Sequence, residues 1–163
     1  MSTLVFPDII ELNEFGGNFQ NYFQAIYAIF KSNFIDNNPT FDGVPVYTKK
    51  FPLTDGKYHR TFYHVTHEGE DESNRNPDMR RMERIKYPKF IADNNPHTEL
   101  LVWIEKRKNE DRIHVLNMEE GYLLVFAKRK NFLLLWTAFY LEYNHQRRKK
   151  LKKYDEYIKA KTA

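Results

Sequence analysis

Two apolar segments joined by a short basic turn constrain the fold more than any other feature of this chain. The segments are Tyr122–Phe126 and Phe132–Tyr140, and the turn between them is Lys128–Asn131. Runs of this length, rich in aromatic and aliphatic residues and separated by a turn, are typical of buried strands. The pattern therefore predicts a buried β-hairpin, whose second strand contains a single hydroxyl group, that of Thr137.

An unpaired hydroxyl is costly to bury, so Thr137 needs a partner. The hairpin leads into the basic segment His145–Lys153, which suggests a phosphate as that partner. The commoner alternative is a bond to a backbone carbonyl or a neighbouring side chain. The turn residues Lys128, Arg129 and Lys130 have two interpretations as well, because cations at a hairpin also prevent edge-to-edge association.

The positive charge of the chain is local. The formal net charge is +4, whereas the segment 146–163 alone holds eight Lys or Arg residues and two acids. A cationic face of this kind attracts nucleic acid by electrostatics, or it is a solvated helix face that maintains solubility. The absence of cysteine excludes disulfides, thiolate catalysis and cysteine-ligated zinc.

The chain of 163 residues is expected to form a single domain, 1–163. Its N-terminus shows no basic segment followed by a long apolar one, and its longest apolar run, Phe132–Leu141, is too short to span a bilayer. We therefore expect a cytoplasmic protein with no membrane partner.

The periodicity predicts an α+β fold, with helices packed on one face of an antiparallel sheet of about four to six strands. A helix with Asn18 as its cap is expected over 18–35, an Arg-rich helix over 77–87 that breaks before Pro88, and a basic C-terminal helix. Strands are expected over 44–51, at a sheet edge because of Pro45, and over 58–66, 99–106, 112–117, 122–128 and 132–140.

Three histidines, His59, His64 and His67, lie in or just after the strand expected over 58–66. On a strand His64 shares a face with Tyr58, Arg60 and Phe62, and His67 falls on the opposite face unless the strand has ended. A histidine with a near-neutral pKa is suited to general acid or base catalysis. The alternative is that His64 and His67 are ordinary exposed residues at a strand end.

The helix expected over 77–87 places Arg80 and Arg84 one turn apart on the same face, with Tyr87 near them. Two guanidinium groups at this spacing fit a phosphate, because each is a planar fork of donors. A solvated face with local ion pairs explains the same pattern, and Glu83 and Asp78 offer the carboxylates for it.

Taken together, these segments resemble the phage-associated branch of the barnase/EndoU/colicin/RelE nuclease superfamily. The resemblance covers 58–157, a nuclease-like core, and leaves 1–50 as a separate N-terminal helical region. It rests on Arg80–Pro88, Val102-Trp103, Tyr122–Lys130, Leu134–Tyr140 and His145–Lys149.

The resemblance implies metal-independent cleavage of RNA, in which the ribose 2′-hydroxyl attacks its own 3′-phosphate, without a metal or other cofactor. It implies His64 as general base and His67 as second choice or as acid, Arg80 and Arg84 on the scissile phosphate, Thr137 as a hydrogen-bond donor and Tyr140 against a base. The RNA backbone on either side of the scissile phosphate would contact these basic residues: Lys128, Arg129, Arg147, Arg148, Lys149, Lys150, Lys152 and Lys153.

The expected partners are RNA and a cognate inhibitor or antitoxin protein, as in toxin or phage-conflict nucleases. A non-catalytic RNA- or DNA-binding module with the same basic face is the first alternative. A structural protein whose aromatic N-terminal helix docks on another chain is the second.

Overall fold

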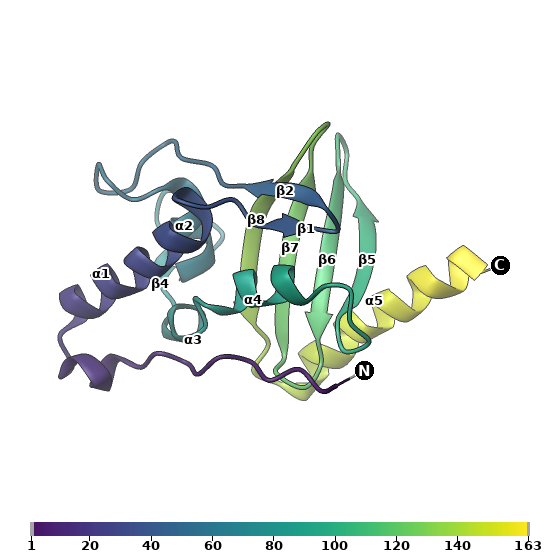
Figure 1. Ribbon diagram of the computed structural model, residues 1–163, viewed down its shortest axis with the longest axis horizontal. Helices are drawn as coiled ribbons and strands as arrows, with labels where there is room; N and C mark the ends of the chain where they lie inside the picture. Colours follow the sequence, from purple (N-terminus) through teal and green to yellow (C-terminus); the bar gives the residue numbers. More distant parts are fainter. Residues whose placement is uncertain (1, 163) are drawn as a thin grey trace.

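The computed structural model describes residues 2–162, which form an α+β fold built around one six-stranded sheet (Figure 1). The strand order is β1-β2-β8-β7-β6-β5, and β3 and β4 form a separate two-stranded ribbon. The helices are α1 (Phe19–Phe30), α2 (Arg60–Thr66), α3 (Met79–Glu83), α4 (Tyr87–Asn94) and α5 (Asn144–Thr162), with a 3-10 turn at Leu12–Phe15 and a π-helical turn at Lys31–Ile35. The strands are β1 (Thr40–Phe41), β2 (Val44–Tyr47), β3 (His67–Glu68), β4 (Asn76–Pro77), β5 (Leu101–Lys106), β6 (Asp111–Asn117), β7 (Tyr122–Lys128) and β8 (Leu133–Tyr140).

The predicted meander is confirmed. Strands β5 to β8 pair antiparallel in chain order, and the hairpin of β7 and β8 lies in the middle of the sheet. Residues 122–127 of β7 are all buried, because helices cover one face of this strand and side chains of its neighbours, including Trp136, Phe139 and Tyr154, cover the other. The continuous apolar run is therefore explained by burial on both sides.

Two predictions about the sheet are wrong. It is mixed, because β2 pairs parallel with β8 through Val46↔Leu133 and Tyr47↔Leu134. β2 is not the edge strand, because the two-residue strand β1 pairs antiparallel with its other side. Pro45 lies opposite Thr40 on this short strand, so its missing N–H affects only the outermost pairing.

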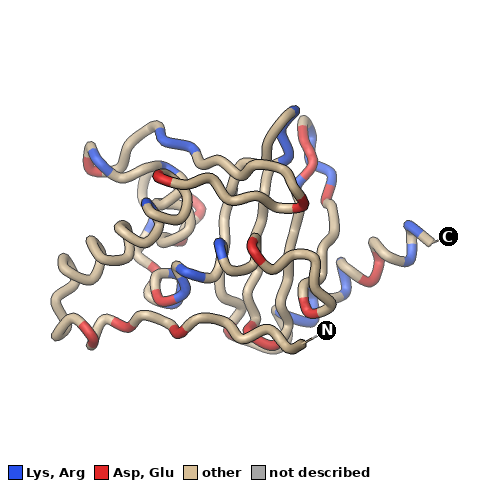
Figure 2. Tube along the Cα trace, viewed as in Figure 1, with Lys and Arg blue, Asp and Glu red and all other residues tan. Residues whose placement is uncertain are grey.

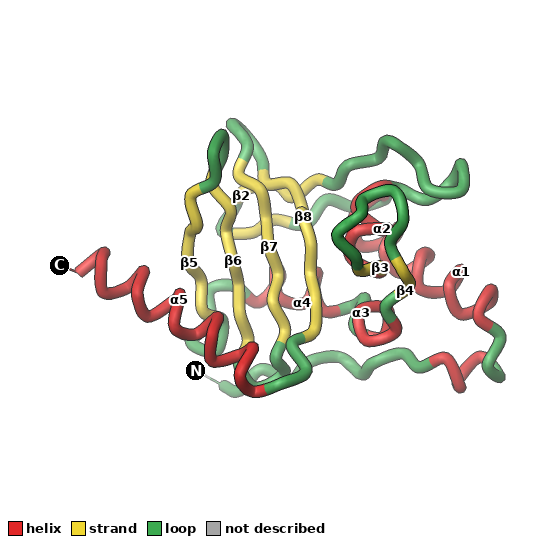
Figure 3. The backbone as a smooth tube through the Cα atoms, turned by 180° about the vertical axis from the view of Figure 1, so that it is seen from behind, coloured by secondary structure: helices red, strands yellow, loops and turns green. Residues whose placement is uncertain are grey.

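The sheet has two differently covered faces. One packs against α1, α2 and α4 through a core that includes Tyr22, Phe62 and Ile91, with Leu124 and Phe126 from β7. The other, called the open face below, carries these sheet residues: Trp103, Leu116, Leu123 and Val125. Helix α5 crosses one end of the open face, and no other helix of residues 2–162 lies over the rest of it (Figure 3). The expectation that all helices pack on one face is therefore wrong.

The N-terminal helix was predicted correctly. Asn18 caps α1 by accepting a hydrogen bond from the Asn21 backbone N–H at 3.0 Å. Its residues Tyr22, Ile26 and Phe30, spaced by four, are buried against the sheet. The π-helical turn then extends the helical segment to Ile35.

The strand expected over 58–66 is wrong, because this segment forms α2. Backbone N–H groups of its first residues are satisfied from outside: Arg60 donates to the Lys50 carbonyl at 3.0 Å and Thr61 to the Lys49 carbonyl at 3.1 Å. Thr61, Phe62, Tyr63, Val65 and Thr66 are all buried. A short helix covered on most sides shows no amphipathic period, so its β-branched and aromatic residues mimic a strand.

The Arg-rich helix expected over 77–87 is also shorter than predicted. Asp78 caps α3 through the Arg81 N–H at 3.2 Å, and the helix ends at Glu83. A second helix, α4, starts at Tyr87 with Pro88 in its first turn. Pro88 therefore starts a helix, because a proline in the first turn removes only an N–H that has no intrahelical acceptor.

Candidate active site

A β-bulge in β8 determines which side chains reach the open face. Val125 pairs with Thr137 and Phe126 with Leu135, so Trp136 is an extra residue in β8. Val125 lies on the open face and Leu135 in the helix-covered core, so the bulge places Trp136 and Thr137 on the open face together. Both side chains are half-buried.

His64 reaches Trp136 from α2, which lies alongside β8. The two rings are 6.1 Å apart and nearly perpendicular. Nε2 of His64 is hydrogen-bonded to Oε1 of Glu72, a residue of the loop between β3 and β4. Burial lowers the pKa of His64, and the bond to Glu72 opposes this effect without cancelling it. At neutral pH His64 is therefore mainly a neutral imidazole, the form that accepts a proton.

Arg112 contacts Trp136 from β6, and the sequence analysis did not predict a role for it. Its guanidinium lies 3.9 Å from the centre of the Trp136 ring, while its Nη2 is 2.8 Å from Oε1 of Glu110. The alternation of β6 places Arg112 on the face opposite Ile113. That alternation was readable from the sequence, but the contact with Trp136 depends on the bulge.

A second polar group, the Glu105 cluster, lies beside α5 on the same face. Glu105 accepts a hydrogen bond from Trp103 Nε1 at 3.0 Å and from Arg107 Nη1 at 3.1 Å, and its Oε1 is 3.6 Å from Lys153 Nζ. His114 stacks on Trp103 at 5.1 Å, and its Nε2 is 3.6 Å from Oε2 of Glu105. Within residues 2–162 neither of its ring nitrogens has a hydrogen-bond partner. Burial lowers the pKa of His114 to about 4.

His67 is separated from His64 by the end of α2. Its ring is buried and stacks on Tyr63 at 4.5 Å, and its Nδ1 is 2.9 Å from the Thr66 hydroxyl. It lines a hollow of about 490 Å³ beside α1, together with Phe19 and Phe23. Burial lowers the pKa of His67 too. The two predicted histidines therefore do not face one another.

Arg80 and Arg84 bracket a carboxylate. Glu83 is buried; its Oε2 is 3.1 Å from Arg80 Nη2 and its Oε1 is 3.2 Å from Arg84 Nη1. Arg84 also lies 3.8 Å from the centre of the Tyr140 ring. The register pairs Tyr140 with Tyr122, so Tyr140 is on the helix-covered side. The arrangement matches the local ion-pair alternative and separates these three residues from Thr137.

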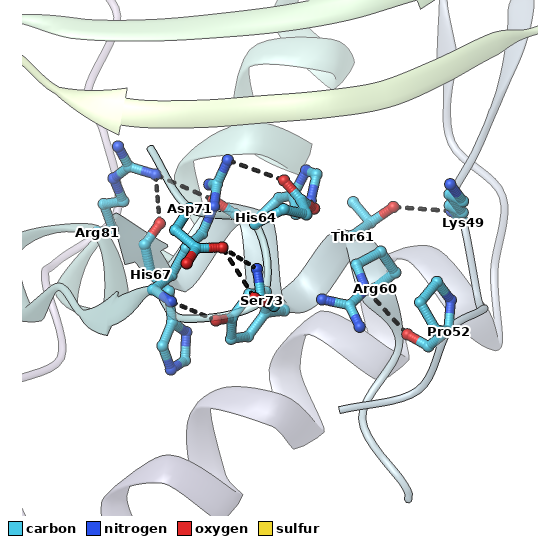
Figure 4. A network of polar contacts seen from close by, with 12 residues as sticks. Lys49, Pro52, Arg60, Thr61, His64, His67, Asp71, Ser73 and Arg81 are labelled. Atoms are coloured by element: carbon cyan, nitrogen blue, oxygen red, sulfur yellow. Dashed lines mark hydrogen bonds and ion pairs between the residues drawn. The ribbon is translucent and has the colours of Figure 1, made fainter. Parts of the chain in front are cut away.

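Arg81, which had no predicted role, holds the end of α2. Its Nη1 donates to the backbone carbonyls of His64 at 3.0 Å and His67 at 2.7 Å (Figure 4). Asp78 pairs with its Nε at 3.2 Å. Arg81 therefore fixes the junction between α2 and β3.

The residues predicted to bind nucleic acid fall into three places. Lys128 and Arg129 are at the far turn of the β7–β8 hairpin, where Arg129 pairs with Glu110. Arg147 donates to the carbonyls of Leu141 at 2.8 Å and Glu119 at 3.2 Å, so it joins α5 to the sheet. Of the others on α5 (Figure 2), these are exposed: Arg148, Lys149, Lys152 and Lys153; Lys150 is half-buried.

Comparison with protein-family models, with curated proteins and with solved structures finds no match to this chain. Within residues 2–162 no helix combines the length and the apolar character needed to cross a membrane. Over the same residues, no three His, Asp or Glu side chains are grouped as ligands for a metal ion.

Proposed function

We propose that this protein is an endoribonuclease that cleaves RNA by attack of the ribose 2′-hydroxyl on the adjacent phosphate. One observation carries the proposal: an imidazole, a guanidinium and a hydroxyl surround one indole ring at the open face. His64 lies against the edge of Trp136, Arg112 lies over its ring, and Thr137 follows it in β8. The resemblance in sequence to small nucleases supports the same chemistry.

Each group has a role in this reaction. Neutral His64 accepts the proton of the 2′-hydroxyl as this oxygen bonds to phosphorus, and Arg112 stabilises the charge that develops on the phosphorane. The bond from phosphorus to the 5′-oxygen then breaks, and that oxygen takes a proton from solvent. Thr137 donates a hydrogen bond to a non-bridging oxygen, and Trp136 offers a flat surface for a base. The nucleophile is the 2′-hydroxyl, so DNA of the same sequence has no reactive group and remains intact.

The test is incubation of the purified protein with end-labelled RNA in EDTA, with DNA of the same sequence as control. We expect RNA products that end in a 2′,3′-cyclic phosphate. His64→Gln should lower kcat/KM by about 10²–10⁴-fold, as loss of a general base does. Arg112→Lys keeps the charge but loses the planar fork and should lower the rate by about 10²-fold or more.

Controls separate chemistry from folding. Thr137→Val keeps the shape of the side chain and removes the hydroxyl, so it should lower kcat with little change in the melting temperature. His145→Gln removes an exposed imidazole on α5 and should leave cleavage unchanged. Intact RNA with folded wild-type protein, or equal rates for wild type and His64→Gln, would refute the proposed reaction.

A second candidate function is nucleic-acid binding without cleavage, and the exposed cations of α5 favour it. The triple variant Arg148→Ala, Lys149→Ala, Lys152→Ala should weaken binding of single-stranded RNA. It should also reduce the slope of log K against log salt by about 2, which is about 0.7 for each lost phosphate contact. Salt-dependent binding of RNA that stays intact would support this function in place of the first.

A further inference from the structure

The loop between β3 and β4 places the carboxylate of Glu72 against the ring of His64. Residues 68–72 of this segment include the four acids Glu68, Glu70, Asp71 and Glu72. The two oxygens of Glu72 are held separately: Oε1 by Nε2 of His64, and Oε2 by Nη2 of Arg75 at 3.3 Å. A single carboxylate therefore bridges donors from α2 and from the end of the loop.

The donors are fixed more firmly than the acceptor. The side chains of His64 and Arg75 are 13% and 18% exposed, whereas that of Glu72 is 56% exposed. The Arg75 backbone N–H donates to the Tyr63 hydroxyl at 2.7 Å, and Nε of Arg75 is buried with no hydrogen-bond partner among the described residues. Arg75 thus has donor capacity that Glu72 does not use.

The loop keeps its own shape without Glu72. Asp71 accepts hydrogen bonds from the Ser73 backbone N–H at 3.0 Å and the Ser73 hydroxyl at 2.8 Å (Figure 4). Gly69, at φ +137°, begins the loop in a conformation that favours glycine. Glu72 can therefore turn away from His64 while the loop and its β3–β4 stem remain folded.

We propose that His64 and Arg75 form a binding site for a phosphate group of RNA, and that Glu72 occupies this site in the free protein. A phosphate offers the same pair of acceptor oxygens as a carboxylate, and a guanidinium with free donors binds it well. The inference rests on the proposed function, because it assigns the phosphate next to the base His64. RNA must then displace Glu72, which lowers its apparent affinity by the fraction of sites that Glu72 fills.

The test compares Glu72→Ala with Glu70→Ala, which removes an equal charge from an exposed neighbour that makes no hydrogen bond or ion pair within the described residues. The ligand is a 2′-O-methyl RNA oligonucleotide, which lacks the nucleophile, and its binding is followed by fluorescence anisotropy. Glu72→Ala should tighten binding by about 3-fold or more, whereas Glu70→Ala should change it by less than about 2-fold. Arg75→Ala should weaken binding by about 10-fold.

A double variant tests whether the two effects share one site. In Glu72→Ala, Arg75→Ala the gain seen with Glu72→Ala alone should disappear, because the site it opens has lost its main donor. Equal affinities for Glu72→Ala and Glu70→Ala would overturn the proposal. So would lower kcat with unchanged affinity in Glu72→Ala, because Glu72 would then be a positioning residue for His64.

Inorganic phosphate separates this inference from the proposed reaction. Phosphate should shift the NMR signals of the His64 ring at a lower concentration in Glu72→Ala than in the wild type, and in Arg75→Ala only at a higher one. If these shifts occur and RNA is bound but not cleaved, the proposed reaction alone is refuted. If RNA is cleaved but phosphate acts on wild type and Glu72→Ala equally, the phosphate site alone is refuted.

Discussion

Replacement of His114 by phenylalanine should reduce the loss of unfolding free energy that occurs as the pH falls below 6.5. Burial against Trp103 and the surrounding strands lowers the pKa of His114 to about 4, compared with 6.5 for a free histidine. Above pH 6.5 the ring is neutral in the folded and unfolded states, so the full stability is present. As the pH falls from 6.5 to 4 the unfolded state binds a proton that the folded state does not, and stability is lost.

The magnitude follows from the size of the shift. A pKa difference of about 2.5 at about 1.4 kcal/mol per pH unit makes the loss about 3.5 kcal/mol well below pH 4. At pH 4, where the folded ring is half protonated, the loss is about 3 kcal/mol. Phenylalanine fills a similar volume and has no titrating group. Because neither ring nitrogen of His114 has a hydrogen-bond partner in the part of the chain that the structure describes, the replacement should be neutral or stabilising at pH 7.

The assay is urea unfolding followed by circular dichroism at pH 7 and pH 4. The unfolding free energy of His114→Phe should fall by about 3 kcal/mol less than that of the wild type. His64 and His67 also have lowered pKa values and stay in both proteins, so their contribution cancels in the comparison. His145→Gln, at an exposed position of α5, serves as the control for replacement of a histidine. Equal losses in wild type and His114→Phe would refute the reasoning.

Three other predictions are measured more directly. Arg147→Ala should lower the unfolding free energy by about 2 kcal/mol because it leaves backbone carbonyls unpaired, whereas exposed Arg148→Ala should stay within about 0.5 kcal/mol in the same urea titration. Gly121→Ala should cost about 1–3 kcal/mol, since Gly121 has φ +66° and a Cβ there would clash with Arg147. For RNA cleavage, log kcat/KM should rise with pH and then reach a plateau, and the midpoint of the rise should lie below pH 6.5 because burial lowers the pKa of His64. A midpoint above pH 6.5 would contradict this.

The parts of the fold that were predictable from sequence are those with local signals. Strands β5 to β8 were predicted within about two residues of their ends because each apolar run is bounded by a polar turn. The segment that became α2 carries a strand-like composition, Thr61-Phe-Tyr-His-Val-Thr66, and its helical state depends on packing between α1 and β8. Tertiary contacts decided this element, and no local rule indicates them.

The same division applies to the candidate site. Chemistry-bearing residue types could be found by inspection, which singled out His64 and Thr137. Glu72 was passed over because it belongs to a polar loop, and only the folded loop brings its carboxylate to His64. Arg80 and Arg84 were chosen for their spacing, but the buried carboxylate of Glu83 takes up their donors.

The bulge in β8 is the feature on which the candidate site depends most. Strict alternation from Leu133 and Leu135 would place Trp136 on the open face and turn Thr137 into the helix-covered core. The extra residue instead returns Ala138 to the core and leaves Thr137 beside Trp136, opposite Val125. Removal of the Thr137 hydroxyl from the core stabilises the sheet, because an unpaired hydroxyl is costly to bury. The same bulge places Thr137 in the row of the open face that contains Val125 and His114, next to Trp136, which His64 contacts.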